Sequence, residues 1–268
     1  DVGRSVAVDS GGNVHVTGRA SRGARNADFV TIKYDPTGEV LWTAYRDWSV
    51  NDDARYLALD QAGNVYVTGD IVSHTTDLEK TAHQDLGMVK FGPEGKEQWA
   101  VSFNGGDASN EVSAGLQLGP EGGVYLLGTI LPAGEPGGQS PPPAEFVVAI
   151  YDADGVLTRD ARHQGAEQAV SMAQGLALDA YGNAYVLASD RGTPGGDPML
   201  TLIKFGSLGE ERWVVRHAGS ATTAGRGVAV GADGAVWIAG SDESDNDYLT
   251  AKYTESKRAA SPKTPVMP

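Results

Sequence analysis

The stretch Asp60-Gln61-Ala62-Gly63-Asn64-Val65-Tyr66-Val67-Thr68-Gly69 decides the fold of this chain, because versions of it recur four more times. The other copies run over residues 9–18, 119–128, 179–188 and 231–240, so successive copies begin 51, 59, 60 and 52 residues apart. Self-similarity at such a period is typical of a repeat architecture. The chain therefore consists of five similar structural units.

Each copy of the stretch predicts a turn between two short strands. Apolar residues alternate with others before the turn, as in 56–59, and again after it, as in 65–68. This period of two is typical of β-strands. The Asp, Gly and Asn between them suit a tight turn, because Gly and Asn tolerate a positive φ and Asp accepts hydrogen bonds from the turn amides.

Two more alternating segments complete each unit. In the second unit they cover 86–91 and the residues around Trp99, with the Gly-containing turn 92–95 between them. Trp42, Trp99 and Trp213 each lie four residues after a turn glycine, whereas the third unit has Arg159 there. Tyr66, Tyr125 and Tyr185 share one position in the second strand. Because these aromatic residues recur with the unit, we expect them to be buried packing residues between units.

Four antiparallel strands per unit at this period predict an all-β fold, the β-propeller. A single such sheet has two apolar faces, so the blades must stack to bury them. We expect one domain over residues 1–253, with blades at roughly 1–50, 51–104, 105–164, 165–219 and 220–253. The predicted arrangement is a closed five-bladed ring, and the alternative is part of a larger propeller. The last unit lacks a fourth strand, and the proline-bearing tail 254–268 is expected to be a linker or disordered.

The motifs in residues 7–18 and 32–42, the first of which recurs in 58–69, resemble the bacterial SBBP repeat, known as the seven-bladed β-propeller repeat. The resemblance covers nearly all of residues 1–253. It implies a bacterial protein of the cell surface, periplasm or medium, and it supplies no catalytic residues. Only five repeats are visible here, which departs from the seven of the family name.

Composition narrows the possible partners. The chain of 268 residues carries 35 acidic and 21 basic side chains, for a net charge of −14. This sign disfavours nucleic acid and anionic membrane surfaces. No run approaches 18 apolar residues, so membrane insertion is not expected. There is no cysteine, which excludes disulfides and a thiolate nucleophile. We expect a monomer.

One position at the start of the first strand of each unit is a candidate ligand site. It carries Arg4, Arg55, Ala114, Gln174 and Arg226. In a closed ring the three arginines would come from neighbouring blades, and with Gln174 they could bind a carboxylate, sulfate or phosphate. The alternative is that each arginine pairs with a local acid such as Asp1, Asp52 or Asp53 and braces the structure.

Acidic residues suggest a second, weaker site. Asp242, Asp245 and Asp247 lie in one loop, where hard oxygen ligands could hold calcium, although the spacing matches no complete calcium loop. No other cofactor is indicated. Asp28, Asp85, Glu145 and Asp247 each precede the third strand of a unit, and their recurrence favours charge pairing between blades.

Three functions fit these features. The first is a non-enzymatic binding propeller that recognises a glycan, peptide or protein through its variable loops. The second is a polysaccharide-acting hydrolase or lyase with carboxylates, and with Arg4, Arg55 and Arg226, at the mouth of the channel. The third is a structural module of a larger surface protein. Neither a Gly-x-Ser-x-Gly elbow nor a Gly-rich phosphate loop is present.

Overall fold

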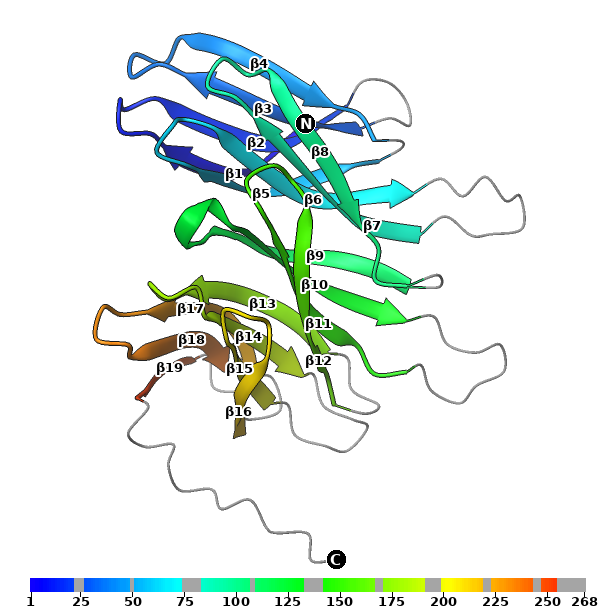
Figure 1. The fold of residues 1–268 in the computed structure, drawn as a ribbon, viewed down its shortest axis with the longest axis vertical. Helices are drawn as coiled ribbons and strands as arrows, with labels where there is room; N and C mark the ends of the chain where they lie inside the picture. Colours follow the sequence, from blue (N-terminus) through cyan, green and yellow to red (C-terminus); the bar gives the residue numbers. More distant parts are fainter. Residues whose placement is uncertain are drawn as a thin grey trace, which may run out of the picture.

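A computed structural model describes residues 1–21, 27–48, 51–73, 83–106, 109–132, 142–166, 171–190, 199–218, 223–242 and 247–254. They form five antiparallel sheets that follow one another along the chain (Figure 1). Within these ranges no helix has the length and apolar character needed to span a membrane.

The strands of each sheet are neighbours in sequence order. The first sheet contains β1 (Val2–Val8), β2 (Val14–Ser21), β3 (Ala27–Tyr34) and β4 (Val40–Arg46), and the second β5 (Asp53–Leu59), β6 (Val65–Ser73), β7 (His83–Phe91) and β8 (Glu97–Phe103). The third contains β9 (Ser109–Leu118), β10 (Val124–Pro132), β11 (Glu145–Tyr151) and β12 (Leu157–Gln164). The fourth contains β13 (Ser171–Leu178), β14 (Ala184–Asp190), β15 (Met199–Phe205) and β16 (Glu211–Ala218), and the three-stranded fifth β17 (Thr223–Val230), β18 (Val236–Asp242) and β19 (Asp247–Tyr253).

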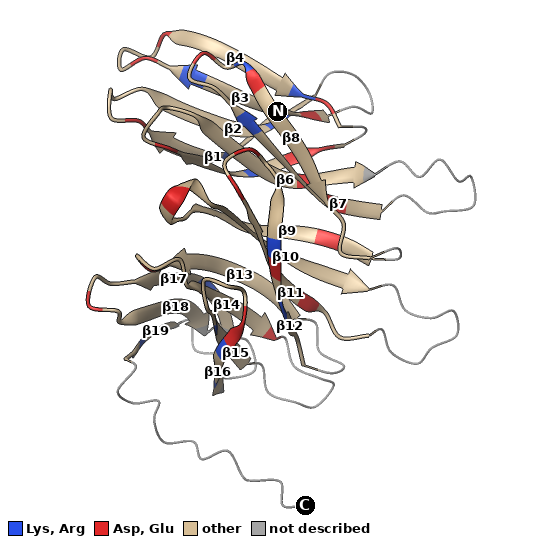
Figure 2. Cartoon of the chain, in the orientation of Figure 1, with Lys and Arg blue, Asp and Glu red and all other residues tan. Residues whose placement is uncertain are grey.

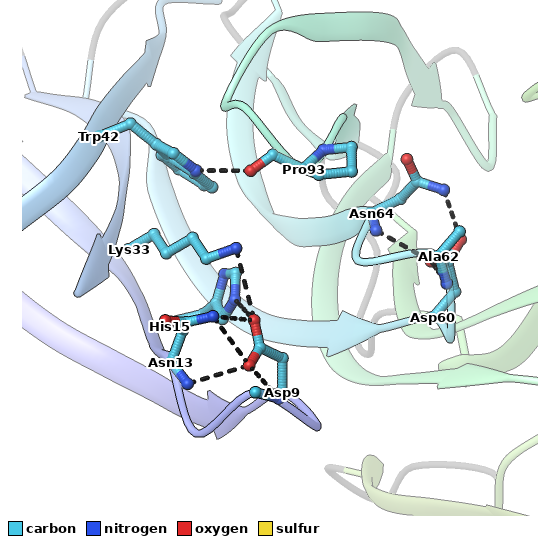
Figure 3. Close-up of polar contacts among 10 residues, drawn as sticks. Asp9, Asn13, His15, Lys33, Trp42, Asp60, Ala62, Asn64 and Pro93 are labelled. Atoms are coloured by element: carbon cyan, nitrogen blue, oxygen red, sulfur yellow. Dashed lines mark hydrogen bonds and ion pairs between the residues drawn. The ribbon is translucent and has the colours of Figure 1, made fainter. Parts of the chain in front are cut away.

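The recurring Asp holds the turn between the first two strands. Asp60 accepts hydrogen bonds from the backbone N–H groups of Ala62 and Asn64, both at 2.9 Å, and from Asn64 Nδ2 at 2.7 Å. Gly63 has a φ of +81°, which explains its recurrence. Asp9 makes the same turn and is also contacted by His15 (Figure 3). The motif therefore shapes the turn.

Apolar clusters join each sheet to the next. The first junction includes Phe29 and Val89, the second Tyr66 and Leu116, the third Tyr125 and Leu176, and the fourth Tyr185 and Val236. All these residues are buried. The core is thus divided among four junctions, and Tyr66, Tyr125 and Tyr185 each lie in one of them.

Trp42 and Trp99, which lie in the fourth strands β4 and β8, reach across the same junctions. Trp42 Nε1 donates to the carbonyl of Pro93 at 2.8 Å (Figure 3), and Trp99 Nε1 donates to the carbonyl of Ala153 at 3.0 Å. In the fourth sheet Trp213 lies beside Tyr185, with ring centroids 6.0 Å apart. All three tryptophans are half-buried rather than buried as expected, because the outer edge of each junction is open to solvent.

The five sheets form an open arc. A closed ring would bury the outward face of the first sheet against that of the fifth, yet Val6 and Val8 on one face and Trp237 and Tyr248 on the other are exposed. Figure 1 shows these two sheets at opposite ends of the molecule. The expected five-bladed closure is thus corrected, because no apolar cluster of the described residues joins the first sheet to the fifth.

Candidate functional site

The first strand of every sheet contains a β-bulge near its start. The extra residues are Arg4, Arg55, Ala114, Gln174 and Arg226, the row singled out in the sequence. First strands of successive sheets contact one another and so line the inner side of the arc. A bulge re-aims the side chain that it carries and is frequent next to functional sites. The row therefore lies along the inner rim.

The structure brings two of these arginines together around two carboxylates. Arg4 pairs with Asp53 through two hydrogen bonds, from Nε at 3.2 Å and from Nη2 at 2.9 Å. Arg55 Nη2 lies 3.8 Å from Asp53 Oδ2, and Arg55 Nε lies 2.6 Å from Asp70 Oδ2. Asp70 in turn accepts hydrogen bonds from the Ser113 backbone N–H and hydroxyl, at 2.7 and 2.8 Å. We call Arg4, Asp53, Arg55 and Asp70 the rim cluster.

The rim cluster has a charged surface and a buried base. The side chains of Arg4 and Arg55 are 41% and 37% exposed, whereas those of Asp53 and Asp70 are only 12% and 5% exposed. Burial raises the pKa of Asp70, although the hydrogen bonds from Ser113 and the charge of Arg55 oppose this. The hydrogen bond to Asp53 raises the pKa of Arg4, so this guanidinium stays charged.

A second carboxyl pair lies deeper, between the second and third sheets. Glu111 is fully buried and accepts a hydrogen bond from the Ser109 hydroxyl. Burial, together with the nearby charge of Asp85, raises the pKa of Glu111 to about 7. Asn104 Nδ2 donates to Asp85 at 3.3 Å. The sequence analysis placed Asp85 in an acidic row but missed Glu111, whose position holds Asp52 in the second unit and Ser171 in the fourth.

The other predicted residues lie apart from the rim cluster. Gln174 and Arg226 are exposed on the bulges of the fourth and fifth sheets. Ala114 is buried and interrupts the row. Arg226 was expected beside Arg4 on the assumption of a closed ring, and the open arc keeps their sheets at opposite ends.

The predicted calcium loop lies largely outside the described residues. Asp245 is not among them, and the side chains of Asp242 and Asp247 are not described either. Elsewhere in the described ranges, no three His, Asp or Glu side chains converge as metal ligands would. Acidic residues are instead spread over turns and strand ends of the sheets (Figure 2).

A groove of about 530 Å³ lies between the third and fourth sheets, at the strand ends opposite the bulges. Its lining includes Tyr125, Arg159, Tyr181 and Leu208. Arg159 stands where the first two sheets have a tryptophan, and Tyr181 and Leu208 are exposed at turn tips. The groove thus forms where the repeat departs from its own pattern.

Five antiparallel sheets stacked along their first strands define a β-propeller, as predicted. No protein-family model matches the chain, and no curated protein sequence does. Among solved structures, it is similar to a lignostilbene dioxygenase of Pseudomonas brassicacearum, with a TM-score of 0.55 and 14% identity over 95% of this chain and 61% of that one. It is also similar to an ulvan lyase of polysaccharide lyase family 25, with a TM-score of 0.56 and 12% identity over 97% of this chain and 69% of that one.

These comparisons confirm the fold class and change the order of the functional hypotheses. At such identities the likeness establishes the fold, and the chain spans about two thirds of the length of each structure. The similarity to the SBBP repeat stays a prediction. The leading hypothesis of a non-enzymatic binding protein is corrected, because the two solved structures named above, which match nearly the whole chain, are enzymes. The polysaccharide-acting alternative takes its place.

Proposed function

We propose that the protein cleaves an acidic polysaccharide at the rim cluster. The observation that carries the proposal is that two partly exposed guanidinium groups, Arg4 and Arg55, cover two buried carboxyl groups, Asp53 and Asp70. The cluster combines a binding surface for anions with a proton-exchanging group. Both are needed to cut a polymer of acidic sugars.

The charges favour an anionic group of the substrate at this point. The protein as a whole is acidic, with a net charge of −14, so a polyanion needs a local cationic surface to bind. A guanidinium has five N–H donors, and pairing with one carboxylate leaves several of them available. The solvent-facing donors of Arg4 and Arg55 therefore suit a carboxylate or sulfate of the sugar.

The carboxyl groups supply the chemistry. In an elimination, a base removes the proton next to the sugar carboxylate, the electron pair forms a carbon–carbon double bond, and the glycosidic C–O bond breaks as its oxygen leaves and takes a proton from an acid or from water. In a hydrolysis, a carboxylic acid protonates the leaving oxygen while a second carboxylate acts as nucleophile or activates water. Asp70 is the proton-exchanging group in either case, because burial raises its pKa above that of an ordinary aspartate. Asp53 pairs with it across β5 and β6 as the second carboxylate.

Shared architecture supports the proposal. The ulvan lyase, a polysaccharide lyase, was solved with a bound fragment that contains glucuronate, and its fold matches nearly all of this chain. Acidic polysaccharides are substrates of the cell surface and its surroundings. The proposal therefore places the protein in the extracellular space, the periplasm or on the cell surface.

A cleavage assay tests this function. The protein is incubated with polygalacturonate, alginate and a sulfated polyuronate, and with a neutral β-glucan as control. New reducing ends report either reaction, whereas the ultraviolet absorbance of an unsaturated product reports elimination alone. Asp70→Asn keeps an oxygen acceptor for Ser113 and should lower the rate by a factor on the order of 100 or more.

Matched variants separate binding from chemistry. Arg55→Gln should weaken retention on an acidic-polysaccharide gel, whereas Arg162→Gln should not, although Arg162 is similarly exposed and paired with Asp160 and Glu145. If no acidic polymer is bound or cut, or if Asp70→Asn cleaves as fast as the parent protein, the proposal fails.

A further inference from the structure

The sheet junctions repeat one arrangement of two complementary faces. On the side facing the preceding sheet, Leu116 in β9 and Leu176 in β13 are buried, each only 7% exposed. Val6 occupies the same position in β1, yet it is 64% exposed, and its neighbour Val8 is also exposed. An apolar groove of about 270 Å³ on this face is lined by Val16, Ile32 and Tyr45, among others. The first sheet thus carries a receiving face that no sheet of the described residues covers.

The fifth sheet carries the other half of the same junction. In the second, third and fourth sheets, the recurring tyrosine of the second strand packs on the following sheet and is at most 5% exposed. Trp237 holds this position in β18 and is 47% exposed. Tyr248 in β19 is 79% exposed, although its counterparts Leu86 and Phe146 are fully buried. The fifth sheet thus presents two large aromatic side chains that no sheet of the described residues covers.

A polar contact also repeats at the junctions. Asp70, Thr129 and Ser189 each accept a hydrogen bond from the backbone N–H of the following first strand, donated by Ser113, Ala173 and Gly225, at 2.7, 2.9 and 2.7 Å. Ser241 is the next residue in this row. Its buried hydroxyl oxygen has no hydrogen-bond partner within the described part of the chain. The corresponding donor at the other end of the arc is the backbone N–H of Gly3.

We propose that a second copy of this chain docks head to tail, with the fifth sheet of one copy against the first sheet of the next. The end faces are complementary because they are the two halves of a junction that each copy already makes four times. Trp237 and Tyr248 then pack over Val6 and Val8. Such a contact joins different faces of the two copies, so the assembled pair keeps one free face of each kind.

The net charge of the protein makes this assembly depend on the salt concentration. Each copy has a net charge of −14, so two copies repel each other at low ionic strength. The contact itself is apolar. Added salt screens the repulsion and leaves the apolar attraction. The average mass in solution therefore rises with both protein concentration and salt concentration.

Sedimentation velocity and light scattering on variants of each end test the contact. Val6→Glu alters only the receiving face, and Trp237→Glu alters only the aromatic face. Both side chains are exposed, so the fold should survive, which circular dichroism checks. Each variant alone should stay at the mass of one copy. An equimolar mixture should reach about twice that mass and no more, since one intact contact remains per pair.

The outcomes decide the proposal. Tyr181→Glu, at an aromatic site that is even more exposed and lies on a turn away from both end faces, should assemble like the parent protein. A parent protein that keeps the mass of one copy at all concentrations and salts overturns the proposal, and the end faces would then be covered by something other than this chain. A Val6→Glu variant that still dimerises alone overturns it as well, because that result requires contact between two like faces.

Discussion

Arg159 reaches the same turn of the following sheet that Trp99 reaches one junction earlier. Trp99 Nε1 donates to the carbonyl of Ala153 at 3.0 Å, and Arg159 Nη1 donates to the carbonyl of Ser207 at 2.7 Å. The hydrogen bond is thus preserved, whereas the volume of the indole is not. The space left over is part of the groove between the third and fourth sheets.

Restoring the tryptophan should stabilise the protein. In Arg159→Trp, the indole can pack on Tyr125 as Trp99 packs on Tyr66, where the ring centroids are 5.9 Å apart. Gly209 still leaves room for it, as Gly95 does for Trp42. We expect a gain of about 0.5–2 kcal/mol in the free energy of unfolding, as is common for cavity-filling changes. Urea denaturation measures it, and a lower midpoint would contradict the packing argument.

Removing an indole should cost stability only where a following sheet exists. Trp99→Ala loses a half-buried ring and its hydrogen bond, so we expect a loss of about 2–3 kcal/mol, below the range for a fully buried aromatic. Trp237→Ala is the control, because no sheet of the described residues covers its 47% exposed ring, and it should cost about 0.5 kcal/mol or less in dilute solution. Equal losses in the two variants would show that the junction is not what Trp99 stabilises.

Glu111 should make stability depend on pH near neutrality. Its pKa is about 7 in the folded state and about 4.3 in an unfolded chain, so the folded state binds its proton more tightly. The resulting stabilisation is complete below the unfolded pKa and is lost as the pH rises through about 7. Glu111→Gln mimics the protonated form, and it should gain about 2–3 kcal/mol on the parent protein between about pH 5 and pH 8.

Denaturation curves at both pH values test this dependence. Glu94→Gln serves as control, because Glu94 is exposed on a turn. The difference in the free energy of unfolding between Glu111→Gln and the parent protein should grow with pH, whereas the difference between Glu94→Gln and the parent protein should not change with pH. A constant difference at both pH values would mean that Glu111 does not change its charge in this range.

The repeat made the fold predictable from the sequence. Alternation around Asp60 and its counterparts located the strands and turns, because a strand pattern and a turn pattern are both local. The bulges that carry Arg4 and Arg55 were not foreseen, although the arginine row was. A bulge adds one residue against the partner strand, and that register becomes visible only when the two strands are paired.

The open arc and the burial of Glu111 could not be predicted from the sequence, for a different reason. Whether five sheets close depends on how the sheets tilt against one another, and five similar repeats do not specify that angle. Glu111 begins a strand and looks solvated in the sequence, yet the neighbouring second sheet buries it. The pairing of Arg4 with Asp53 was weighed as an alternative, whereas the pairing of Arg55 with Asp70 depends on the register of β5 and β6.

Asp179, the turn aspartate of the fourth unit, allows a last test. The pH dependence of stability distinguishes a contribution of its charge from a contribution of its packing. Asp179 accepts hydrogen bonds from the backbone N–H groups of Tyr181 and Asn183, both at 3.0 Å, and from Asn183 Nδ2 at 2.7 Å. Burial alone would raise its pKa, but these hydrogen bonds lower it. A lowered pKa stabilises the fold above the unfolded value near 4, and this contribution is lost as the pH falls.

Asp179→Ala should therefore lower the free energy of unfolding by about 1–2 kcal/mol at neutral pH, and by less in acid, where the parent carboxylate is protonated. The protein should still fold, since the third and fifth units carry Gly119 and Gly231 at this position and still form the turn. Asp179→Asn keeps one oxygen acceptor without the charge, so its free energy of unfolding should lie between those of the parent protein and Asp179→Ala. A cost that is the same at neutral and acidic pH would show that the aspartate acts through its shape and that its charge contributes nothing.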